Sequence, residues 1–123
     1  MKKKTVLVVD DSEIVVAMAS DALEEGGFTV ITAPNAKAAD KYIHSERKPD
    51  LIILDVMLPI LDGDKKAKML KDNPQTKSIP ILLLSSKPAD ELARLVTDSG
   101  ADGFIRKPFI ARNMVDKVRE MLS

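Results

Sequence analysis

The chain has 123 residues, a length that suits one folded domain with a substantial core. Its 19 basic residues balance its 19 acidic residues, which argues against a basic nucleic-acid surface and against an acidic disordered tail. Cysteine is absent, which excludes disulfides and cysteine metal sites. No apolar run approaches the roughly 20 residues of a membrane span. We therefore expect a single domain over residues 1–123, located in the cytoplasm and in contact with neither membrane nor nucleic acid.

The first half of the chain predicts two strands and two helices in alternation. A β-branched run at residues 5–9 stops at Asp-Asp-Ser (10–12), which is a helix start signal. The apolar side chains that follow lie in two adjacent i, i+4 rows, as in an amphipathic helix, and the glycines at 26–27 end it. Residues 28–32 read as the second strand, and an asparagine opens a helix over 35–43.

The second half continues this alternation three more times. An apolar run that leads into Asp55 predicts a strand buried on both of its faces. The elements expected here are strand 50–55, helix 64–71, strand 79–84, helix 89–99, strand 102–106 and a final helix marked by apolar residues from 114 to 122. Such alternation predicts an α/β fold of three layers, α/β/α, in which five helices cover a doubly wound, five-stranded parallel sheet. The strand order 2-1-3-4-5 is compatible with this pattern, although the pattern alone does not fix it.

Polar residues follow four of the five strands. They are Asp10 and Asp11 after the first, Asp55 after the third, Ser85 after the fourth and Lys107 after the fifth. The carboxyl ends of parallel strands meet at one edge of the sheet, so these side chains are expected to converge. Three carboxylates repel one another and favour a hard cation such as Mg²⁺, and an ammonium and a hydroxyl beside that cation favour a phosphoryl group. Asp55 is then the candidate nucleophile, because an aspartate can carry a phosphoryl group as an acyl phosphate.

Four motifs, in this order and at this spacing, resemble the receiver domain of two-component response regulators. They are Val-Asp10-Asp11-Ser, Leu-Asp55-Val-Met-Leu-Pro59 with Asp62-Gly63, Leu-Ser85-Ser86, and Lys107-Pro108-Phe109. The resemblance covers essentially the whole chain. It implies a flavodoxin-like fold with strand order 2-1-3-4-5, and a phosphoryl group taken from the phosphohistidine of a sensor histidine kinase or a phosphotransfer protein.

The resemblance also implies roles for the acidic residues. Asp55 would be the phosphoacceptor. Mg²⁺ would be held by Asp10, Asp11, Asp55 and the backbone carbonyl of Met57. Transfer and dephosphorylation would be catalysed largely by the receiver's own site, so the domain would be a signalling phosphoacceptor rather than an enzyme.

Three further residues complete the implied site and switch. Ser85 would hydrogen-bond the phosphoryl oxygens, and Lys107 would pair with them. Phe104 occupies the aromatic switch position, and the Lys107–Pro108 peptide bond would be cis. A downstream protein partner would read the phosphorylation state on the face built from 89–99, Phe104 and 110–122, which comprises the fourth helix, the fifth strand and the fifth helix.

Other functions remain open from the residues alone. A pseudo-receiver would keep the fold as a phosphorylation-independent interaction module, although no acidic residue of the motif has been lost. A haloacid dehalogenase-like phosphatase needs a second aspartate where this chain has Met57, and a dinucleotide-binding domain needs a glycine-rich turn after the first strand. A stand-alone protein and one domain of a longer protein are both compatible with the sequence.

Several residues also have a structural interpretation. Residues 10–12 can be simple helix caps, and Phe104 can be a core residue as well as a switch. His44 is expected to be exposed and is assigned no chemistry. Four lysines of the third helix are expected to form a solvated face: Lys65, Lys66, Lys68 and Lys71.

Overall fold

The computed structural model describes residues 3–123, so residues 1 and 2 of the expected domain lie outside the described part. Strands and helices alternate along the chain: β1 (Thr5–Val9), α1 (Glu13–Glu25), β2 (Thr29–Ala33), α2 (Ala36–Ile43), β3 (Leu51–Asp55), α3 (Gly63–Lys71), β4 (Ile81–Ser85), α4 (Ala89–Ser99), β5 (Gly103–Arg106) and α5 (Ala111–Leu122). The strands pair in parallel in the order β2-β1-β3-β4-β5, which confirms the predicted doubly wound sheet.

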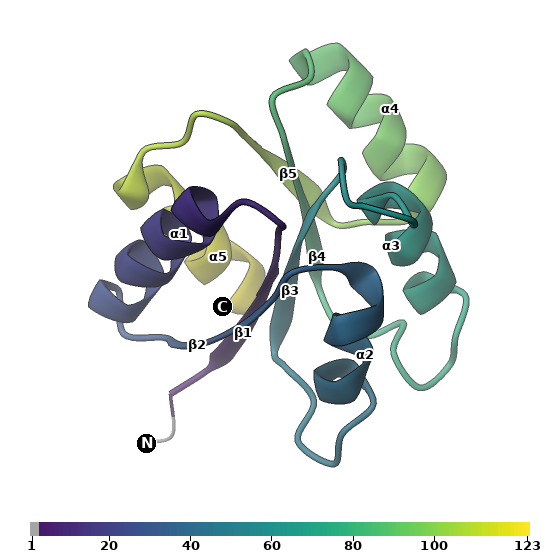
Figure 1. Cartoon of the computed structure of the whole chain (residues 1–123), viewed down its shortest axis with the longest axis horizontal. Helices are drawn as coiled ribbons and strands as arrows, with labels where there is room; N and C mark the ends of the chain where they lie inside the picture. Colours follow the sequence, from purple (N-terminus) through teal and green to yellow (C-terminus); the bar gives the residue numbers. More distant parts are fainter. Residues whose placement is uncertain (1–2) are drawn as a thin grey trace.

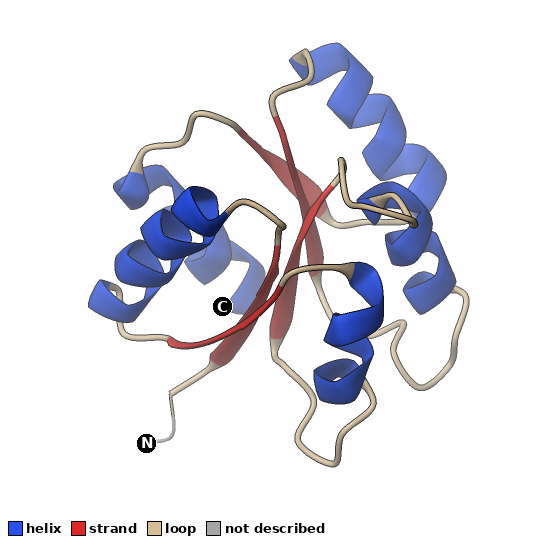
Figure 2. Cartoon of the chain, in the orientation of Figure 1, coloured by secondary structure: helices blue, strands red, loops and turns tan. Residues whose placement is uncertain are grey.

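The helices cover both faces of the sheet. Helices α1 and α5 lie on one side and α2, α3 and α4 on the other, with the twisted sheet between them (Figures 1 and 2). Each crossover from one parallel strand to the next passes through a helix, which is the connection that parallel strands require. The predicted three-layer architecture is therefore confirmed.

The core consists of two apolar clusters, one on each face of the sheet. Successive side chains of a strand point to opposite faces, so Leu7 belongs to the cluster under α2, α3 and α4, whereas Val6 belongs to the cluster under α1 and α5. The four apolar residues of β3, 51–54, are each 0% exposed. This strand is buried on both faces, as its sequence predicts, and it places its last residue, Asp55, at the centre of one sheet edge.

Local signals set most of the helix ends. Ser12 Oγ accepts a hydrogen bond from Val15 N–H at the start of α1, and Asn35 Oδ1 accepts one from Ala38 N–H at the start of α2. Helix α4 ends at Gly100, whose φ of 81° is a left-handed conformation that glycine adopts without strain. The last helix begins at Ala111, ahead of the apolar residues that predicted it.

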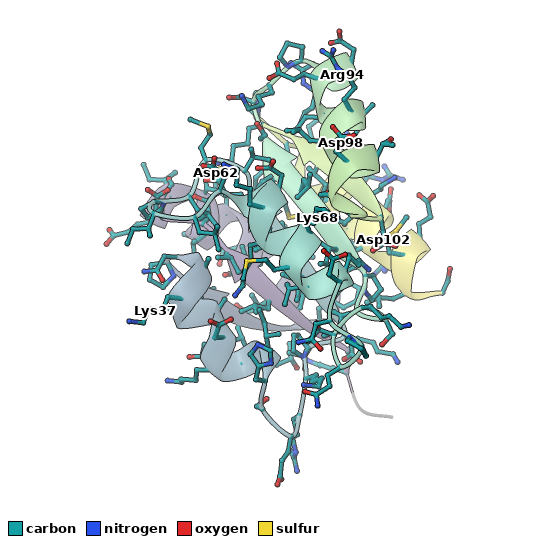
Figure 3. The ribbon with its side chains drawn as sticks, turned by 90° about the vertical axis from the view of Figure 1, so that its right-hand side faces the viewer. Lys37, Asp62, Lys68, Arg94, Asp98 and Asp102 are labelled. Carbon is teal, nitrogen blue, oxygen red and sulfur yellow. The ribbon has the colours of Figure 1, made fainter. Side chains whose placement is uncertain are left out.

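The prediction of a solvated lysine face on α3 is only half right. Lys65 and Lys68 are exposed, and Lys68 is labelled in Figure 3, which looks onto the face covered by α2, α3 and α4. Lys66 instead is 5% exposed and forms an ion pair with Asp40 of α2. The pattern of charges along α3 does not reveal this pairing, because it depends on how closely α2 lies to α3. His44, the residue that follows the last turn of α2, lies beside Asp40 and is exposed as expected.

Lys71 is the second exception on α3. Its Nζ lies 2.8 Å from Asp102 Oδ2 and donates to the backbone carbonyls of Lys77 and Ile79. Lys71 therefore ties the end of α3 to the loop before β4 and to the start of β5. It stabilises the edge of the sheet opposite to the carboxyl ends of the strands.

No helix within residues 3–123 combines the length and the apolar character needed to cross a membrane.

Candidate functional site

Three carboxylates meet at the carboxyl ends of β1 and β3. These two strands are neighbours in the sheet, with Val9 paired to Leu54, so the residues that follow them come together. One carboxylate oxygen from each of Asp10, Asp11 and Asp55 lies within 4.8 Å of the others. Asp10 and Asp55 are buried, and Asp11 is exposed. The structure thus brings together the acidic residues that the sequence predicted to converge.

Backbone amides orient the two buried carboxylates. Ser12 N–H donates to Asp10 Oδ1 at 2.9 Å, and Met57 N–H donates to Asp55 Oδ1 at 3.2 Å. In both cases the donor lies two residues beyond the aspartate, which is the geometry of an Asx turn. The chain therefore turns away from the sheet immediately after each strand and holds the carboxylate at its edge. The side chain of Met57 points into solvent, with 65% of the residue exposed.

Lys107 brings a positive charge to the carboxylates from the end of β5. Its Nζ lies 2.9 Å from Asp10 Oδ2 and 3.4 Å from Asp55 Oδ1. The peptide bond between Lys107 and Pro108 is cis, which is the geometry that the resemblance implies. Lys107 therefore faces two buried carboxylates, and the exposed carboxylate of Asp11 lies beside those two.

This imbalance of charge shifts two pKa values. Burial raises the pKa of the Asp55 carboxyl, and the charge of Asp10 raises it further, while Lys107 and the Met57 amide act in the opposite direction. For Lys107, burial favours the neutral amine, but the close contact with Asp10 and the charges of Asp55 and Asp10 outweigh it and raise the pKa. Asp55 is thus held where its negative charge is costly, and Lys107 is held as a cation.

The donor set fits a divalent cation that prefers oxygen. Asp10 Oδ2 is fully buried, and among the described residues it accepts no hydrogen bond of good geometry. Lys107 Nζ lies close enough for an ion pair but is not directed at this oxygen as a hydrogen-bond donor should be. A buried carboxylate oxygen without a directional partner is uncommon, and a metal ligand is one explanation for it. Three carboxylates that one lysine cannot neutralise provide the hard ligands that Mg²⁺ selects.

Gly63 allows the following helix to approach the site. It donates its N–H to Val56 O at 2.9 Å, and a Cβ placed on it would lie 2.0 Å from the backbone oxygen of Asp55. Any other residue at this position would displace either α3 or the carboxyl end of β3. Glycine is therefore required here because a Cβ has no room, and not because of a left-handed backbone conformation, which Gly63 does not adopt.

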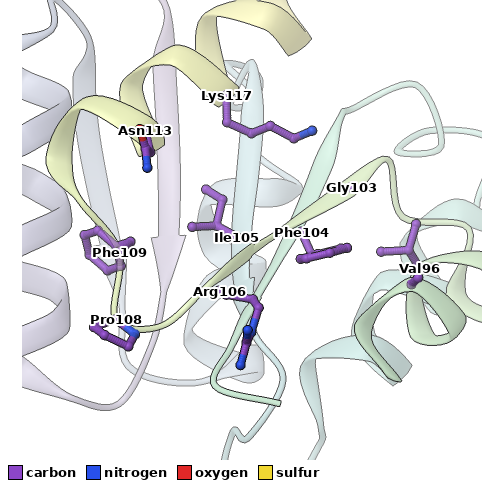
Figure 4. A pocket seen from close by; sticks show the side chains of 10 residues that line it. Val96, Gly103, Phe104, Ile105, Arg106, Pro108, Phe109, Asn113 and Lys117 are labelled. Atoms are coloured by element: carbon purple, nitrogen blue, oxygen red, sulfur yellow. The ribbon is translucent and has the colours of Figure 1, made fainter. Parts of the chain in front are cut away.

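The two remaining predicted residues, Ser85 and Phe104, form no hydrogen bond with the three carboxylates. Ser85 is buried at the end of β4, and its Oγ accepts a hydrogen bond from Lys87 N–H at 3.1 Å. Phe104 of β5 is half-buried and packs on the core cluster beneath α4, beside Val96 (Figure 4). It therefore has the core role that its sequence allowed, at the inner wall of a surface hollow of about 620 Å³ between α4 and α5.

Comparison with known proteins agrees with this geometry. The model of the response regulator receiver domain family matches residues 6–119. The chain belongs to this family. The general function of these receiver domains is phosphorylation-dependent switching in two-component signal transduction, and they are signalling domains rather than enzymes in the ordinary sense. As a family they bind Mg²⁺ in an acidic pocket and interact with histidine kinases and output domains.

Individual relatives of this receiver domain are similar over nearly its whole length. The alkaline phosphatase synthesis transcriptional regulatory protein PhoP of Bacillus subtilis is 42% identical over 119 residues, which are 97% of this chain and 48% of that protein. The phosphate regulon transcriptional regulatory protein PhoB of Pseudomonas aeruginosa is 38% identical over 122 residues, 99% of this chain and 53% of that protein. The chain thus spans about half the length of these relatives. The structure of the chemotaxis response regulator CheY4 of Vibrio cholerae matches with a TM-score of 0.90 and 30% identity, over 98% of this chain and 100% of that one.

Two residues of this receiver contribute to the site without having been assigned a role in it from the sequence. The sequence predicts Ser12 only as a helix cap, but its amide also orients Asp10. The sequence assigns no role to Arg106, yet its Nε donates to Lys87 O at 3.0 Å and so reaches the loop that follows Ser85. The first could have been found from the Asp-x-Ser spacing of an Asx turn. The second has no signal in the sequence, because an arginine at the end of a strand is usually solvated.

Proposed function

We propose that this receiver domain accepts a phosphoryl group from the phosphohistidine of a sensor histidine kinase or a phosphotransfer protein, and that Asp55 is the acceptor. In this reaction an Asp55 carboxylate oxygen forms a bond to phosphorus as the bond from phosphorus to the histidine nitrogen breaks. The imidazole leaves with the electron pair and takes up a proton, and the product is an acyl phosphate. Hydrolysis of that acyl phosphate by water restores the carboxylate and ends the signal.

One observation carries this proposal. Asp55 lies at the centre of the sheet edge, with the carboxylates of Asp10 and Asp11 within 4.8 Å and the ammonium of Lys107 at 3.4 Å. A charge-balanced structural cluster would not need three acids for one lysine. An arrangement that becomes balanced when it binds a cation and a phosphoryl group explains both the excess of carboxylates and the lysine among them.

Asp10, Asp11, Asp55 and the backbone carbonyl of Met57 are the proposed ligands of Mg²⁺. The ion would offset the negative charge that accumulates on the phosphoryl oxygens. Lys107 would pair with the same oxygens, and the Ser85 hydroxyl would donate to them. These residues stand at the carboxyl ends of four strands, β1, β3, β4 and β5, which share one edge of the parallel sheet.

The same residues supply a route to a partner. When Ser85 turns toward the phosphoryl group, Phe104 on the neighbouring strand would turn inward, and the face formed by α4, β5 and α5 would change shape. A downstream protein, or an output domain in the same polypeptide, would read this change. We propose that the receiver itself catalyses transfer and dephosphorylation, works in the cytoplasm, and contacts neither nucleic acid nor membrane directly.

Intact-mass spectrometry after incubation with acetyl phosphate and Mg²⁺ tests this function. The wild-type chain is expected to gain one phosphoryl group, and the gain should disappear when EDTA removes Mg²⁺. Asp55→Ala removes the acceptor and should give no adduct, whereas Asp64→Ala, at the start of α3 outside the site, should behave as wild type.

A different result would point to another function. If wild type forms no adduct while still binding Mg²⁺, the constitutive interaction module without phosphorylation becomes the better explanation. If an adduct persists in Asp55→Ala, the acceptor has been assigned to the wrong residue, and peptide mapping of the adduct would locate the correct one.

A further inference from the structure

The loop between β4 and α4 is fixed mainly at Lys87. The amide of Lys87 donates to Ser85 Oγ at 3.1 Å, and its carbonyl accepts from Arg106 Nε at 3.0 Å. Its ammonium lies 3.3 Å from Glu91 Oε1 in the first turn of α4. The residue two positions after Ser85 is therefore held at its amide, at its carbonyl and at its side chain.

Arg106 reaches this loop from the end of β5. In the register of the sheet it is paired with Ser85, the last residue of β4. Residues two apart in a strand point to the same face, so Arg106 lies on the same face of β5 as Phe104. Both line the hollow beneath α4, where Figure 4 shows them side by side along the strand. One face of β5 thus carries both Phe104, the proposed switch residue, and Arg106, whose guanidinium holds the loop that follows Ser85.

These contacts determine what can move when Ser85 engages a phosphoryl group. The backbone of Ser85 is held in the sheet, because Lys107 N–H donates to Ser85 O at 2.8 Å. Its hydroxyl is bonded to Lys87 N–H, and within residues 3–123 the structure shows no hydrogen bond from it to Asp55. If the hydroxyl turns toward Asp55, the Lys87 amide loses its acceptor unless the loop follows. Arg106 opposes that movement because it anchors the carbonyl of the same residue.

We propose that Arg106 is a positioning residue for Ser85, acting through Lys87. It holds the Ser85 hydroxyl in the orientation seen in the structure and so opposes the phosphoryl-bound state. This inference rests on the proposed function. Loss of one hydrogen bond from an exposed charged donor should favour the phosphoryl-bound state by about two- to tenfold.

Beryllofluoride with Mg²⁺ tests this inference, because it binds a carboxylate reversibly in place of a phosphoryl group. The chain contains three phenylalanines, so labelling with 4-fluorophenylalanine gives three fluorine NMR signals, and Phe104→Leu identifies the one from Phe104. Titration of wild type, Arg106→Met and Arg94→Met would give the apparent affinity from the Phe104 signal. Arg94 is the matched control, an exposed arginine of α4 that makes no hydrogen bond or ion pair with the described residues.

Arg106→Met is expected to bind beryllofluoride about two- to tenfold more tightly than wild type and Arg94→Met. Removal of a positive charge near an anion site would by itself weaken binding, so tighter binding cannot come from charge alone. If Arg106 only stabilises the fold, the variant will unfold at lower urea concentration in the absence of Mg²⁺ but will bind with unchanged affinity. Unchanged or weaker binding therefore overturns the inference.

Two controls separate the possible failures. If wild type does not bind beryllofluoride, or if binding persists in Asp55→Ala, the proposed function itself fails, and this inference fails with it. If wild type binds and Arg106→Met binds equally well, only the role of Arg106 is wrong. Arg106→Gln, which is too short to reach the loop in the same way, replaces Arg106→Met if circular dichroism shows that the methionine variant does not fold.

Discussion

The carboxylate of Asp55 ends a strand that is buried on both faces, and the carboxylate of Asp10 lies beside it. Burial and this second charge both raise the pKa of Asp55, and Lys107 only partly offsets them. In the absence of a cation, ionised Asp55 therefore makes the fold less stable. A buried charge that costs stability within a cluster of carboxylates is typical of a functional site.

This cost predicts how the metal-free stability depends on pH. Because the pKa of Asp55 in the fold lies above its ordinary value of 3.8, the folded chain binds more protons than the unfolded chain between these two values. The contribution of Asp55 to stability is fully present below 3.8, is lost as pH rises through this window, and stays lost at neutral pH. The raised pKa of Lys107 acts only in the alkaline range, where its ammonium loses its proton.

Asp55→Asn should accordingly be more stable than wild type at neutral pH in EDTA, and the difference should shrink as the pH falls below the window. Urea unfolding across the acidic to neutral range measures this. Added Mg²⁺ should stabilise wild type but have much less effect on the variant, which lacks one ligand. Asp21→Asn, on the exposed side of α1, should stay within about 0.5 kcal/mol of wild type under all conditions. A metal-free Asp55→Asn that is less stable than wild type would contradict the inferred cost of this charge.

At the scale of the elements, the pair of Lys66 and Asp40 links α3 to α2. The side chain of Lys66 is 6% exposed, whereas that of Asp40 is 44% exposed. The two partners are therefore not equivalent. Removing the charge of Asp40 leaves a buried ammonium without a counter-ion, but removing the charge of Lys66 leaves a carboxylate that water can still reach.

Asp40→Asn is therefore expected to lower the free energy of unfolding by about 1–3 kcal/mol. Lys66→Met keeps the length of the side chain and removes the buried charge, so its effect should be within about 1 kcal/mol of neutral and could be stabilising. Lys65→Met, at the exposed neighbouring position, is the control and should change stability by less than about 0.5 kcal/mol. Urea denaturation of the three variants measures these differences. Equal losses in Asp40→Asn and Lys66→Met would show that the pair acts as an ordinary contact rather than as compensation for a buried charge.

The helices and strands of this fold can largely be predicted from local sequence signals, but the face of each helix that packs on the core cannot. The apolar run of β3 has no polar side to expose, so its burial on both faces is determined by composition. In α1 the two apolar rows are buried unequally: Ala19 and Leu23 of one row are buried, whereas in the other row Ile14 is 73% and Met18 is 49% exposed and Ala22 is buried. Which row packs inward depends on the direction of the helix across the sheet, and periodicity does not contain that information.

The same distinction applies to the site. Asp10, Asp55 and Lys107 could be placed together from the sequence because the carboxyl ends of parallel strands share one edge. The hydrogen bond from Arg106 to Lys87 O could not, because it depends on where a loop passes over a strand end. Burial of Lys66 cannot be predicted from the sequence for the same reason, because it depends on the distance between α2 and α3, which are separated by a strand in the chain. Sequence patterns predict which side chain stands at the end of each strand, whereas tertiary contacts determine which hydrogen bonds and ion pairs hold that side chain in place.

At the scale of the whole molecule, the strand order makes the domain asymmetric about Asp55. Strand β3 is central, with β1 and β2 on one side and β4 and β5 on the other. The residues proposed to respond to the phosphoryl group, Ser85, Lys107 and Phe104, all come from the β4 and β5 side. The β1 and β2 side supplies acidic residues that are already fixed by backbone amides or lie in solvent, so it has little to rearrange.

Hydrogen exchange measured with and without beryllofluoride and Mg²⁺ should show this asymmetry. Amides that exchange by local opening in the β4–α4 loop, α4 and β5, residues 86–106, should change their exchange rates by about fivefold or more, the range of ordinary coupling between sites. Amides of the same kind in β2 and α2, residues 29–43, are the internal control and should change much less. Amides that exchange only by global unfolding should slow everywhere, because any ligand of the folded state protects them equally. Asp55→Ala should abolish all of these changes. A response spread evenly over both halves of the sheet would mean that the ligand stabilises the fold as a whole, without a switch confined to the α4, β5 and α5 face.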